Sequence, residues 1–186
     1  MKVDSNTLIT TLRYGNQLKR TARTGWVQRG VANAEDVAAH SYGTAFAAMI
    51  LAEALDDDLD KGRMLSMALL HDLPESLTSD IPTPSWVYLP PGSKSEVEEA
   101  AMDEIFAQTE YGRKMMDLWR ELQAAQTAEA MIVHDADKID MFLQAVIYEE
   151  STGNKQLEEF WTSRPQFNLS ISQEIYEQLL EGQKSP

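Results

Sequence analysis

The sequence predicts a single all-α domain, and three observations support this fold class. The chain has 186 residues, which is enough for one domain with a substantial hydrophobic core. Alanine, leucine, methionine, glutamate and glutamine recur throughout, whereas runs of β-branched residues are scarce. No internal repeat, low-complexity segment or linker divides the chain. We therefore expect residues 1–186 to form one unit, with a core over about 8–150 and short helices over about 155–182.

A first amphipathic helix is expected near the N-terminus. Leu8 and Leu12 are four residues apart and therefore lie on one face of a helix. Either Ser5 or Asn6 can cap its amino end, because both side chains accept hydrogen bonds from backbone N–H groups. A turn should follow over residues 24–30, which include two glycines.

A second helix should begin after Asp36. Asn33, with Asp36 three residues later, resembles an N-cap pair that opens a helix over residues 37–55. Small residues, mainly alanine, are frequent in this segment, so neighbouring helices can approach it closely.

The third helix is expected over residues 61–72, with Asp60 as its cap. Pro74 should end this helix, because a proline disfavours helical geometry in the residue before it. Residues 78–92 contain four prolines and read as a loop. A loop of this length is above the usual range, which indicates a functional role.

Later helices follow from further capping patterns. Ser93 with Glu96 matches a capping box, and Thr127 is suited to cap a long helix. The predicted helices cover residues 93–108, 112–122 and 128–150, and the tail after residue 155 suggests one or two short ones.

Composition excludes several classes of function. The absence of cysteine rules out disulfide frameworks, thiolate zinc sites, iron–sulfur clusters and cysteine nucleophiles. The net charge of −14 argues against a nucleic-acid polymer as partner, although residues 1–34 carry six basic side chains and one acidic side chain. The apolar stretch 45–51 is too short to cross a membrane, and the N-terminus does not resemble a signal peptide. We expect a cytoplasmic protein.

Chemistry-bearing residues gather after the third helix. His71 and Asp72 close the apolar stretch 67–70, and Glu75 and Asp80 follow shortly. Burying such groups is costly unless they are paired or bind a cation, and the last turn of a helix also favours positive charge. Three close carboxylates and an imidazole therefore indicate a divalent metal. The alternative is that the histidine is structural.

His40, then His71-Asp72, then Asp137 follow one another in the order H…HD…D. This order resembles the signature of the HD-domain family of metal-dependent phosphohydrolases. The similarity covers roughly residues 8–150 and is greatest to the 5′-deoxynucleotidase branch, which includes the HD-domain-containing protein 2 and YfbR types. The matching blocks are 18–26, 35–41, 70–75 with 79–84, and 135–140.

The resemblance implies an HD-domain fold with a metal site between helices. His40, His71, Asp72 and Asp137 would ligate one divalent ion, and two imidazoles with two carboxylates suit Mn²⁺, Co²⁺, Fe²⁺ or Mg²⁺. Such a set leaves positions for water and for a phosphate oxygen. A bound ion lowers the pKa of water and neutralises phosphoryl charge.

The activity implied by the resemblance is hydrolysis of deoxyribonucleoside 5′-monophosphates to deoxyribonucleoside and phosphate. In the family, the acidic residue matching Glu75 helps to activate water, and the one matching Asp80 assists near the leaving oxygen. Two alternatives are an HD phosphohydrolase of another small phosphate or signalling nucleotide, and a non-catalytic interaction protein with a structural metal. Glu75 and Asp80 favour an enzyme, since a structural metal needs neither. The family also implies a homodimer.

Basic residues precede the first predicted ligand and suit a phosphate. In the YfbR type the phosphate-binding arginine directly precedes the tryptophan matching Trp26, whereas this chain has Gly25 there. Arg23, Arg20 and Arg29 therefore remain as candidates for that role.

Trp26, Thr83 and His134 are further candidates for contacts at the site. The resemblance implies that Trp26 lines the sugar pocket and disfavours a 2′-hydroxyl, and packing in the core is the alternative. The loop ending at Thr83 would complete the nucleotide site. His134 shares a helix face with Asp137, so it either touches the edge of the site or is an ordinary, partly exposed histidine.

Overall fold

The computed structural model describes residues 4–55, 58–82, 85, 87–106, 109–162 and 164–184. These residues form helices and connecting segments, which confirms the all-α class, and strand-like pairing among them is limited to one bridge between Ala22 and Asp36. The helices are α1 (Ser5–Gln17), η1 (Leu18–Arg20), α2 (Thr24–Gln28), α3 (Val37–Ala54), α4 (Lys61–Leu70), α5 (Glu75–Thr78), α7 (Ser93–Phe106), α8 (Glu110–Ala124), α9 (Ala128–Thr152), η2 (Lys155–Leu157), α10 (Glu158–Thr162) and α11 (Ser170–Lys184).

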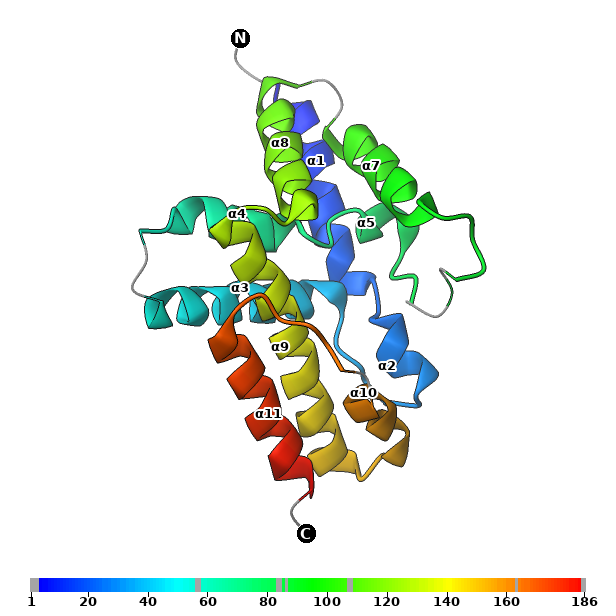
Figure 1. Ribbon diagram of the computed structural model, residues 1–186. Coiled ribbons are helices and arrows are strands. Elements are labelled where there is room, and N and C mark those ends of the chain that lie inside the picture. Colours follow the sequence, from blue (N-terminus) through cyan, green and yellow to red (C-terminus); the bar gives the residue numbers. More distant parts are fainter. Residues whose placement is uncertain are drawn as a thin grey trace.

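Helix α9 is the central element of the molecule (Figure 1). It crosses α3, packs against α4 and α8, and runs beside α11 toward the C-terminus. Helices α1, α7 and α8 gather at the other end, near the N-terminus. No helix in the described ranges combines the length and apolar character that a membrane crossing requires.

Buried side chains form three clusters that hold these helices together. One joins α3, α4 and α9 through residues such as Met64, Met67 and Ile132, all fully buried. A second joins α7 and α8 around Met102 and Trp119. The third surrounds Trp26 and links α2 to the last turns of α9 and to η2. Large side chains in a close-packed interior fix the relative positions of α3, α4 and α9.

Capping residues begin several helices where the sequence predicts them. Asp60 and Thr127 each accept a hydrogen bond from a backbone N–H in the first turn of α4 and α9, so both predicted caps are confirmed. At α1 the prediction is wrong, because Asp4 rather than Ser5 or Asn6 accepts the capping bonds. The helix begins at Ser5, so the residue before it takes the cap position.

The segment predicted to be a turn contains the short helix α2. It is followed by Gly30, whose φ of 72° lies in the left-handed region that favours glycine. The backbone N–H of Thr24, at the start of α2, donates to Asp80 over 2.6 Å. That contact joins residues 56 positions apart, so local sequence does not reveal it.

A sharp corner connects α4 to α5. Helix α4 ends at Leu70, two residues before its predicted end, and α5 begins at Glu75. Pro74 suits both events, because proline interrupts a preceding helix and its fixed φ fits the first turn of the next. His71 and Asp72 therefore lie in a corner between two helices rather than in the last turn of one.

Most remaining boundaries differ from the prediction by a few residues. Helix α8 starts at Glu110 rather than residue 112, because Thr109 caps it. The tail ends in α11, which has 15 residues and is longer than the short helices expected. The predicted end of the helix from Ser93 at residue 108, and residues 83, 84 and 86 of the predicted loop, lie outside the described residues.

Candidate metal centre

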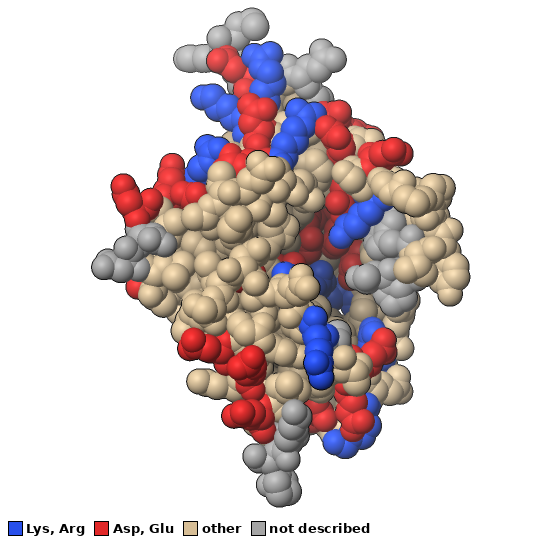
Figure 2. All heavy atoms as spheres, viewed as in Figure 1, with Lys and Arg blue, Asp and Glu red and all other residues tan. Residues whose placement is uncertain are grey.

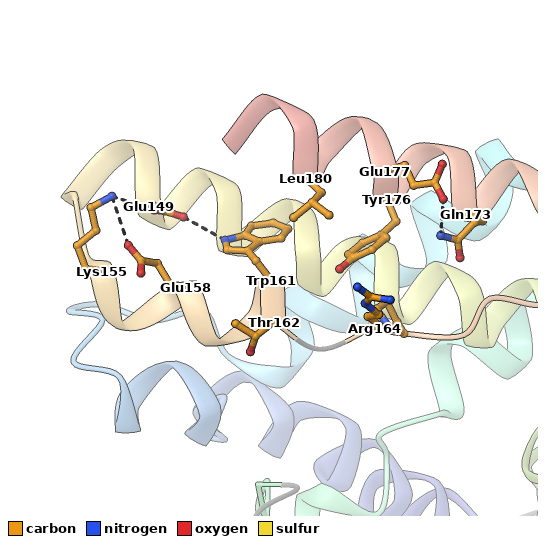
Figure 3. A pocket seen from close by; sticks show the side chains of 11 residues that line it. Glu149, Lys155, Glu158, Trp161, Thr162, Arg164, Gln173, Tyr176, Glu177 and Leu180 are labelled. Carbon is orange, nitrogen blue, oxygen red and sulfur yellow. Dashed lines mark hydrogen bonds and ion pairs between the residues drawn. The ribbon is translucent and has the colours of Figure 1, made fainter. Parts of the chain in front are cut away.

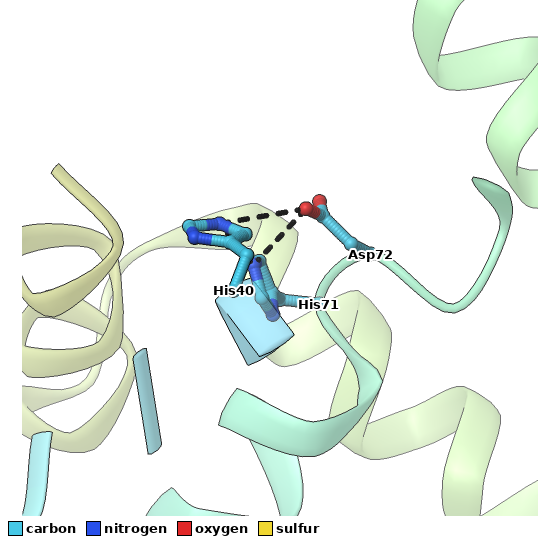
Figure 4. A group of neighbouring side chains, drawn as sticks. All are labelled: His40, His71 and Asp72. Carbon is cyan, nitrogen blue, oxygen red and sulfur yellow. Dashed lines mark hydrogen bonds and ion pairs between the residues drawn. The ribbon is translucent and has the colours of Figure 1, made fainter. Parts of the chain in front are cut away.

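The residues predicted to ligate a metal come from three parts of the fold and lie together. His40 is fully buried in α3, His71 and Asp72 occupy the corner after α4, and Asp137 lies on α9. Nε2 of His40 is 3.0 Å from Oδ1 of Asp137, 3.2 Å from Nε2 of His71 and 3.6 Å from Oδ2 of Asp72. Figure 4 shows His40, His71 and Asp72 pointing toward one another. The ligand role of each stays a prediction, but the residues form one cluster.

Hydrogen bonds turn both imidazoles toward this cluster. Nδ1 of His71 donates to the carbonyl of Ala68 over 2.7 Å, and Nδ1 of His40 is 2.8 Å from Oδ2 of Asp140. Metal-ligating histidines generally donate their other ring nitrogen to a carbonyl or carboxylate in this way. Metal–ligand bonds of about 2.0 to 2.2 Å place neighbouring ligand atoms roughly 3 Å apart. The ligand atoms of His40, His71 and Asp72 all lie within 4.8 Å of one another and fit a divalent ion, and Asp137 contacts this group through His40.

The pKa values indicate that the cluster favours positive charge. Burial alone would lower the pKa of His40, but hydrogen bonds with Asp137 and Asp140 outweigh it and raise this pKa to about 10. Burial opposes ionisation of Asp137, whereas the hydrogen bond and charge of His40 lower its pKa to about 2. Asp72 likewise keeps a lowered pKa despite burial, because His71, Arg23 and His40 stabilise its charge. A divalent ion would supply the positive charge that these carboxylates attract.

Two further carboxylates border the cluster. Burial, together with the charges of Asp72 and Asp80, raises the pKa of Glu75 to about 9. Its Oε2 atom is buried without a hydrogen-bond partner, so it can accept a proton or a ligand without breaking a contact at that oxygen. Asp80 is held at the start of α2, where its Oδ2 accepts from the N–H of Thr24 and its carbonyl from the Thr24 hydroxyl, both over 2.6 Å.

Arg23 is the candidate arginine that contacts the cluster. Its Nη1 is 3.2 Å from Oδ2 of Asp72, and its side chain is 15% exposed. Burial lowers the pKa of Arg23, but the surrounding carboxylates, Asp72 foremost, outweigh it and raise the pKa. In Figure 2 a hollow near the centre of the face contains both acidic and basic side chains. Arg23 therefore combines an anchor on the cluster with access from outside.

Comparison with known proteins identifies the family. The HD-domain family model matches residues 15–177. The chain belongs to the HD-domain family. The human protein named 5′-deoxynucleotidase HDDC2 is 36% identical over 148 residues, which are 78% of this chain and 70% of that protein. The protein of the same name from Dictyostelium discoideum is 40% identical over 141 residues, 72% of this chain and 73% of its own length.

Solved structures agree with the HD-domain assignment. The crystal structure of the PH0347 protein from Pyrococcus horikoshii OT3 superposes with a TM-score of 0.81 and 34% sequence identity, covering 93% of this chain and 98% of that one. A conserved hypothetical protein from Pyrococcus furiosus gives a TM-score of 0.80 at 35% identity, covering 93% and 99% of the two chains. The fold that the sequence resemblance implies is therefore confirmed over nearly the whole chain.

The other two candidate arginines of this HD-domain protein, Arg29 and Arg20, contact residues outside the cluster. Arg29 donates to the carbonyl of Gly25, pairs with Glu159 at 3.0 Å and lies over the ring of Phe160. These contacts occupy both Nη atoms of Arg29, so fewer of its donors are left for a phosphate than in Arg23. A phosphate contact by Arg29 stays a prediction. The side chain of Arg20 donates to two neighbouring polar residues of its own segment, Asn16 and Gln17.

Two other residues are predicted to bind substrate, Trp26 and Thr83. Trp26 lies in the core. Trp26 is 2% exposed, donates from Nε1 to Glu35 and packs against Tyr148 and Phe160. Its position therefore fits the core-packing alternative, and a role at the sugar pocket stays a prediction. Thr83 lies outside the described residues.

His134 fits the structural interpretation. Its Nε2 is 2.8 Å from the carbonyl of Leu122, in the last turn of α8, where carbonyls lack partners within their own helix. The neighbouring Asp135 is fully buried and binds backbone N–H groups before α11. A second His-Asp dipeptide thus serves packing, which shows that the dipeptide alone does not identify a metal site.

Two residues near the metal centre carry no assignment from the sequence. Asp140 contacts His40, and Glu35 lies close enough that its carboxylate, the Asp140 carboxylate and a His40 nitrogen are within 4.8 Å of one another. Asp140 follows Asp137 by three residues, and residues with this spacing share a helix face. That spacing is a sequence signal that could have indicated Asp140. No local pattern connects Glu35 to a helix more than a hundred residues later.

A cavity elsewhere in the molecule is separate from this cluster. It has a volume of about 680 Å³ and lies between the end of α9, α10 and α11, where Trp161, Arg164 and Tyr176 are among its lining residues (Figure 3). It includes none of the predicted ligands or catalytic residues. We place the functional site at the histidine–aspartate cluster, because the ligand-type groups meet there.

Proposed function

We propose that this HD-domain protein is a metal-dependent 5′-deoxynucleotidase, which hydrolyses deoxyribonucleoside 5′-monophosphates to deoxyribonucleoside and phosphate. The observation that carries the proposal is the meeting of His40, His71, Asp72 and Asp137 beside Arg23. The names of the human and Dictyostelium relatives support the same substrate class. Mn²⁺, Co²⁺, Fe²⁺ and Mg²⁺ are the ions that suit two imidazoles and two carboxylates.

The side chains can perform distinct parts of this reaction. His40, His71, Asp72 and Asp137 would hold a divalent ion, which would lower the pKa of a water molecule and neutralise charge on the phosphoryl group. Without a metal the pKa of Glu75 is raised to about 9, so its carboxyl group is protonated at neutral pH. The charge of a bound ion would lower this pKa, and Glu75, whose Oε2 has no hydrogen-bond partner, would then accept a proton from the attacking water. Arg23 binds phosphate oxygens with the guanidinium atoms that Asp72 leaves free. Asp80, held by Thr24, would assist at the leaving oxygen.

Phosphate release from a panel of nucleotides tests the proposal. Purified protein is supplied in turn with each of the four metals and incubated with deoxy- and ribonucleoside 5′-monophosphates. We expect the deoxy compounds to be hydrolysed faster than their ribose counterparts with at least one metal. If metal-loaded protein hydrolyses no deoxyribonucleoside monophosphate, the proposed function is wrong.

Replacement of Arg23 by alanine is expected to lower kcat/KM about 100-fold, because a charge-assisted contact to the phosphate is lost. Its affinity for Mn²⁺ should not fall, since a positive group is removed from beside Asp72. Steady-state kinetics and Mn²⁺ titration measure the two quantities. The control is Arg20→Ala, whose side chain contacts Asn16 and Gln17 instead. Unchanged kcat/KM in the Arg23 variant would remove the residue from the phosphate site.

A homodimer and a cytoplasmic location complete the proposal. Tyr42, Phe46 and Ile50 recur every four residues along α3 and are 72%, 51% and 51% exposed. Between Val37 and Ala52, α3 carries no acidic or basic side chain other than buried His40. A helix that is apolar on all sides is usually buried, and a second copy of the chain would cover this outer face.

The substitution Phe46→Glu is expected to convert the dimer to a monomer, because it places a charge in the centre of the covered face. Light scattering coupled to size-exclusion chromatography measures the mass. The control is Leu12→Glu, at an exposed position of α1. A wild-type protein that is monomeric at micromolar concentration would contradict this prediction.

A further inference from the structure

Asp140 contacts one of the predicted metal ligands, His40. Its Oδ2 is 2.8 Å from Nδ1 of His40, on the side of the ring that faces away from the other ligands. The Asp140 side chain is 17% exposed and His40 is fully buried, so competition from water is limited. This contact fixes the rotation of the imidazole and directs Nε2 toward His71 and Asp137.

Gly43 provides the space for this carboxylate. It lies one turn after His40 on α3, and a Cβ atom at this position would be 2.6 Å from Cγ and 2.9 Å from Oδ2 of Asp140, with Oδ1 closer still. Such contacts are much shorter than van der Waals distances, so the carboxylate would have to move. Glycine inside a helix is about 1 kcal/mol less favourable than alanine. The close approach of Asp140 explains why glycine occupies this position despite that cost.

We propose that Asp140 is a positioning residue of the metal centre and that Gly43 is the gap in α3 that admits it. The two residues act as a unit, because Asp140 reaches His40 only where α3 lacks a Cβ atom. The inference rests on the metal site of the proposed function but not on its substrate. According to this proposal, the affinity of the site for the ion depends on two residues that do not ligate it.

Binding of Mn²⁺ alone, without nucleotide, tests the pair. Protein stripped of metal with a chelator is titrated with Mn²⁺, and the free ion is followed by electron paramagnetic resonance. We expect Asp140→Ala to weaken the affinity 10- to 100-fold, the usual effect of losing such a support, and Asp140→Asn to weaken it less because its amide oxygen still accepts from Nδ1. Gly43→Ala should weaken it by a similar factor to Asp140→Ala.

The double variant Gly43→Ala/Asp140→Ala distinguishes a unit from two separate defects. If the residues act together, its affinity matches that of Asp140→Ala; if they act independently, the two fold-changes multiply. Gly15→Ala is the matched control, because a Cβ there would meet nothing within 4 Å on helix α1. Circular dichroism melting confirms that each variant is folded.

Three results would overturn the inference. These are wild-type Mn²⁺ affinity in Asp140→Ala, fold-changes that multiply in the double variant, and a wild-type protein that binds no Mn²⁺. If Gly43→Ala does not fold, the comparison of Asp140→Ala with Asp140→Asn still decides the role of the carboxylate. A wild-type protein that binds Mn²⁺ but releases no phosphate from nucleotides disproves only the proposed function.

Discussion

Replacement of Asp72 by alanine is expected to abolish both metal binding and phosphate release. Oδ2 of Asp72 is the most connected oxygen of the cluster, 3.3 Å from Nε2 of His71, 3.6 Å from Nε2 of His40 and 3.2 Å from Arg23. Its loss removes one ligand and leaves Arg23 free to repel a cation. We expect kcat/KM to fall at least about 1,000-fold, which corresponds to roughly 4 kcal/mol of transition-state stabilisation.

Metal titration and phosphate release are measured on the same Asp72→Ala preparation. The control variant is Asp103→Ala, which removes an exposed carboxylate from α7 without approaching the cluster. The metal-free variant loses the pairing of Asp72 with Arg23 and the two histidines, so its fold is checked by circular dichroism before the titration. Turnover comparable to wild type in Asp72→Ala would show that Asp72 is not a ligand.

Replacement of Asp135 by alanine is expected to cause a large loss of stability, about 3 to 5 kcal/mol. The carboxylate is fully buried and accepts hydrogen bonds from the backbone and side chain of Asn168 and from the backbone of Leu169, at 2.9 to 3.0 Å. Truncation leaves these donors without a partner and detaches the segment that leads into α11. The melting temperature should fall by about 10 °C for a chain of this size.

Thermal and urea unfolding of the metal-free protein measure this effect. Asp117→Ala, at an exposed position of α8, should change stability by less than about 0.5 kcal/mol. Asp135→Asn keeps one acceptor oxygen and should lose less stability than the alanine variant. A melting temperature equal to wild type in Asp135→Ala would contradict the role assigned to the carboxylate.

The sequence predicts this fold well where a local pattern determines the structure. Asp60 and Thr127 precede runs of helix-forming residues, and both act as the caps expected. The helix from Asp36 to about residue 55 is also correct, because one alanine-rich segment follows one capping side chain. Short elements are missed: α2 depends on Asp80, which reaches its first N–H from another part of the chain.

The site was predictable as far as a sequence motif extends. The spacing of His40, His71-Asp72 and Asp137 identifies residues that the fold brings together. The spacing of Asp140 from Asp137 places both on one helix face, but its contact with His40 also needs the space at Gly43, which lies about one hundred residues earlier. The different surroundings of Arg23 and Arg29 also need the tertiary structure, since only packing reveals that Arg29 lies against Phe160 and Glu159.

The separation of His40 and Asp140 by one hundred positions in the chain has a consequence for protein synthesis. When a ribosome has made the chain as far as Asp72, three of the four predicted ligands are present, but the helix that carries Asp137 does not yet exist. The binding site can close only after α9 has emerged and packed across α3. A nascent chain that binds an ion through all four predicted ligands can therefore do so in the final geometry only after α9 has packed against α3.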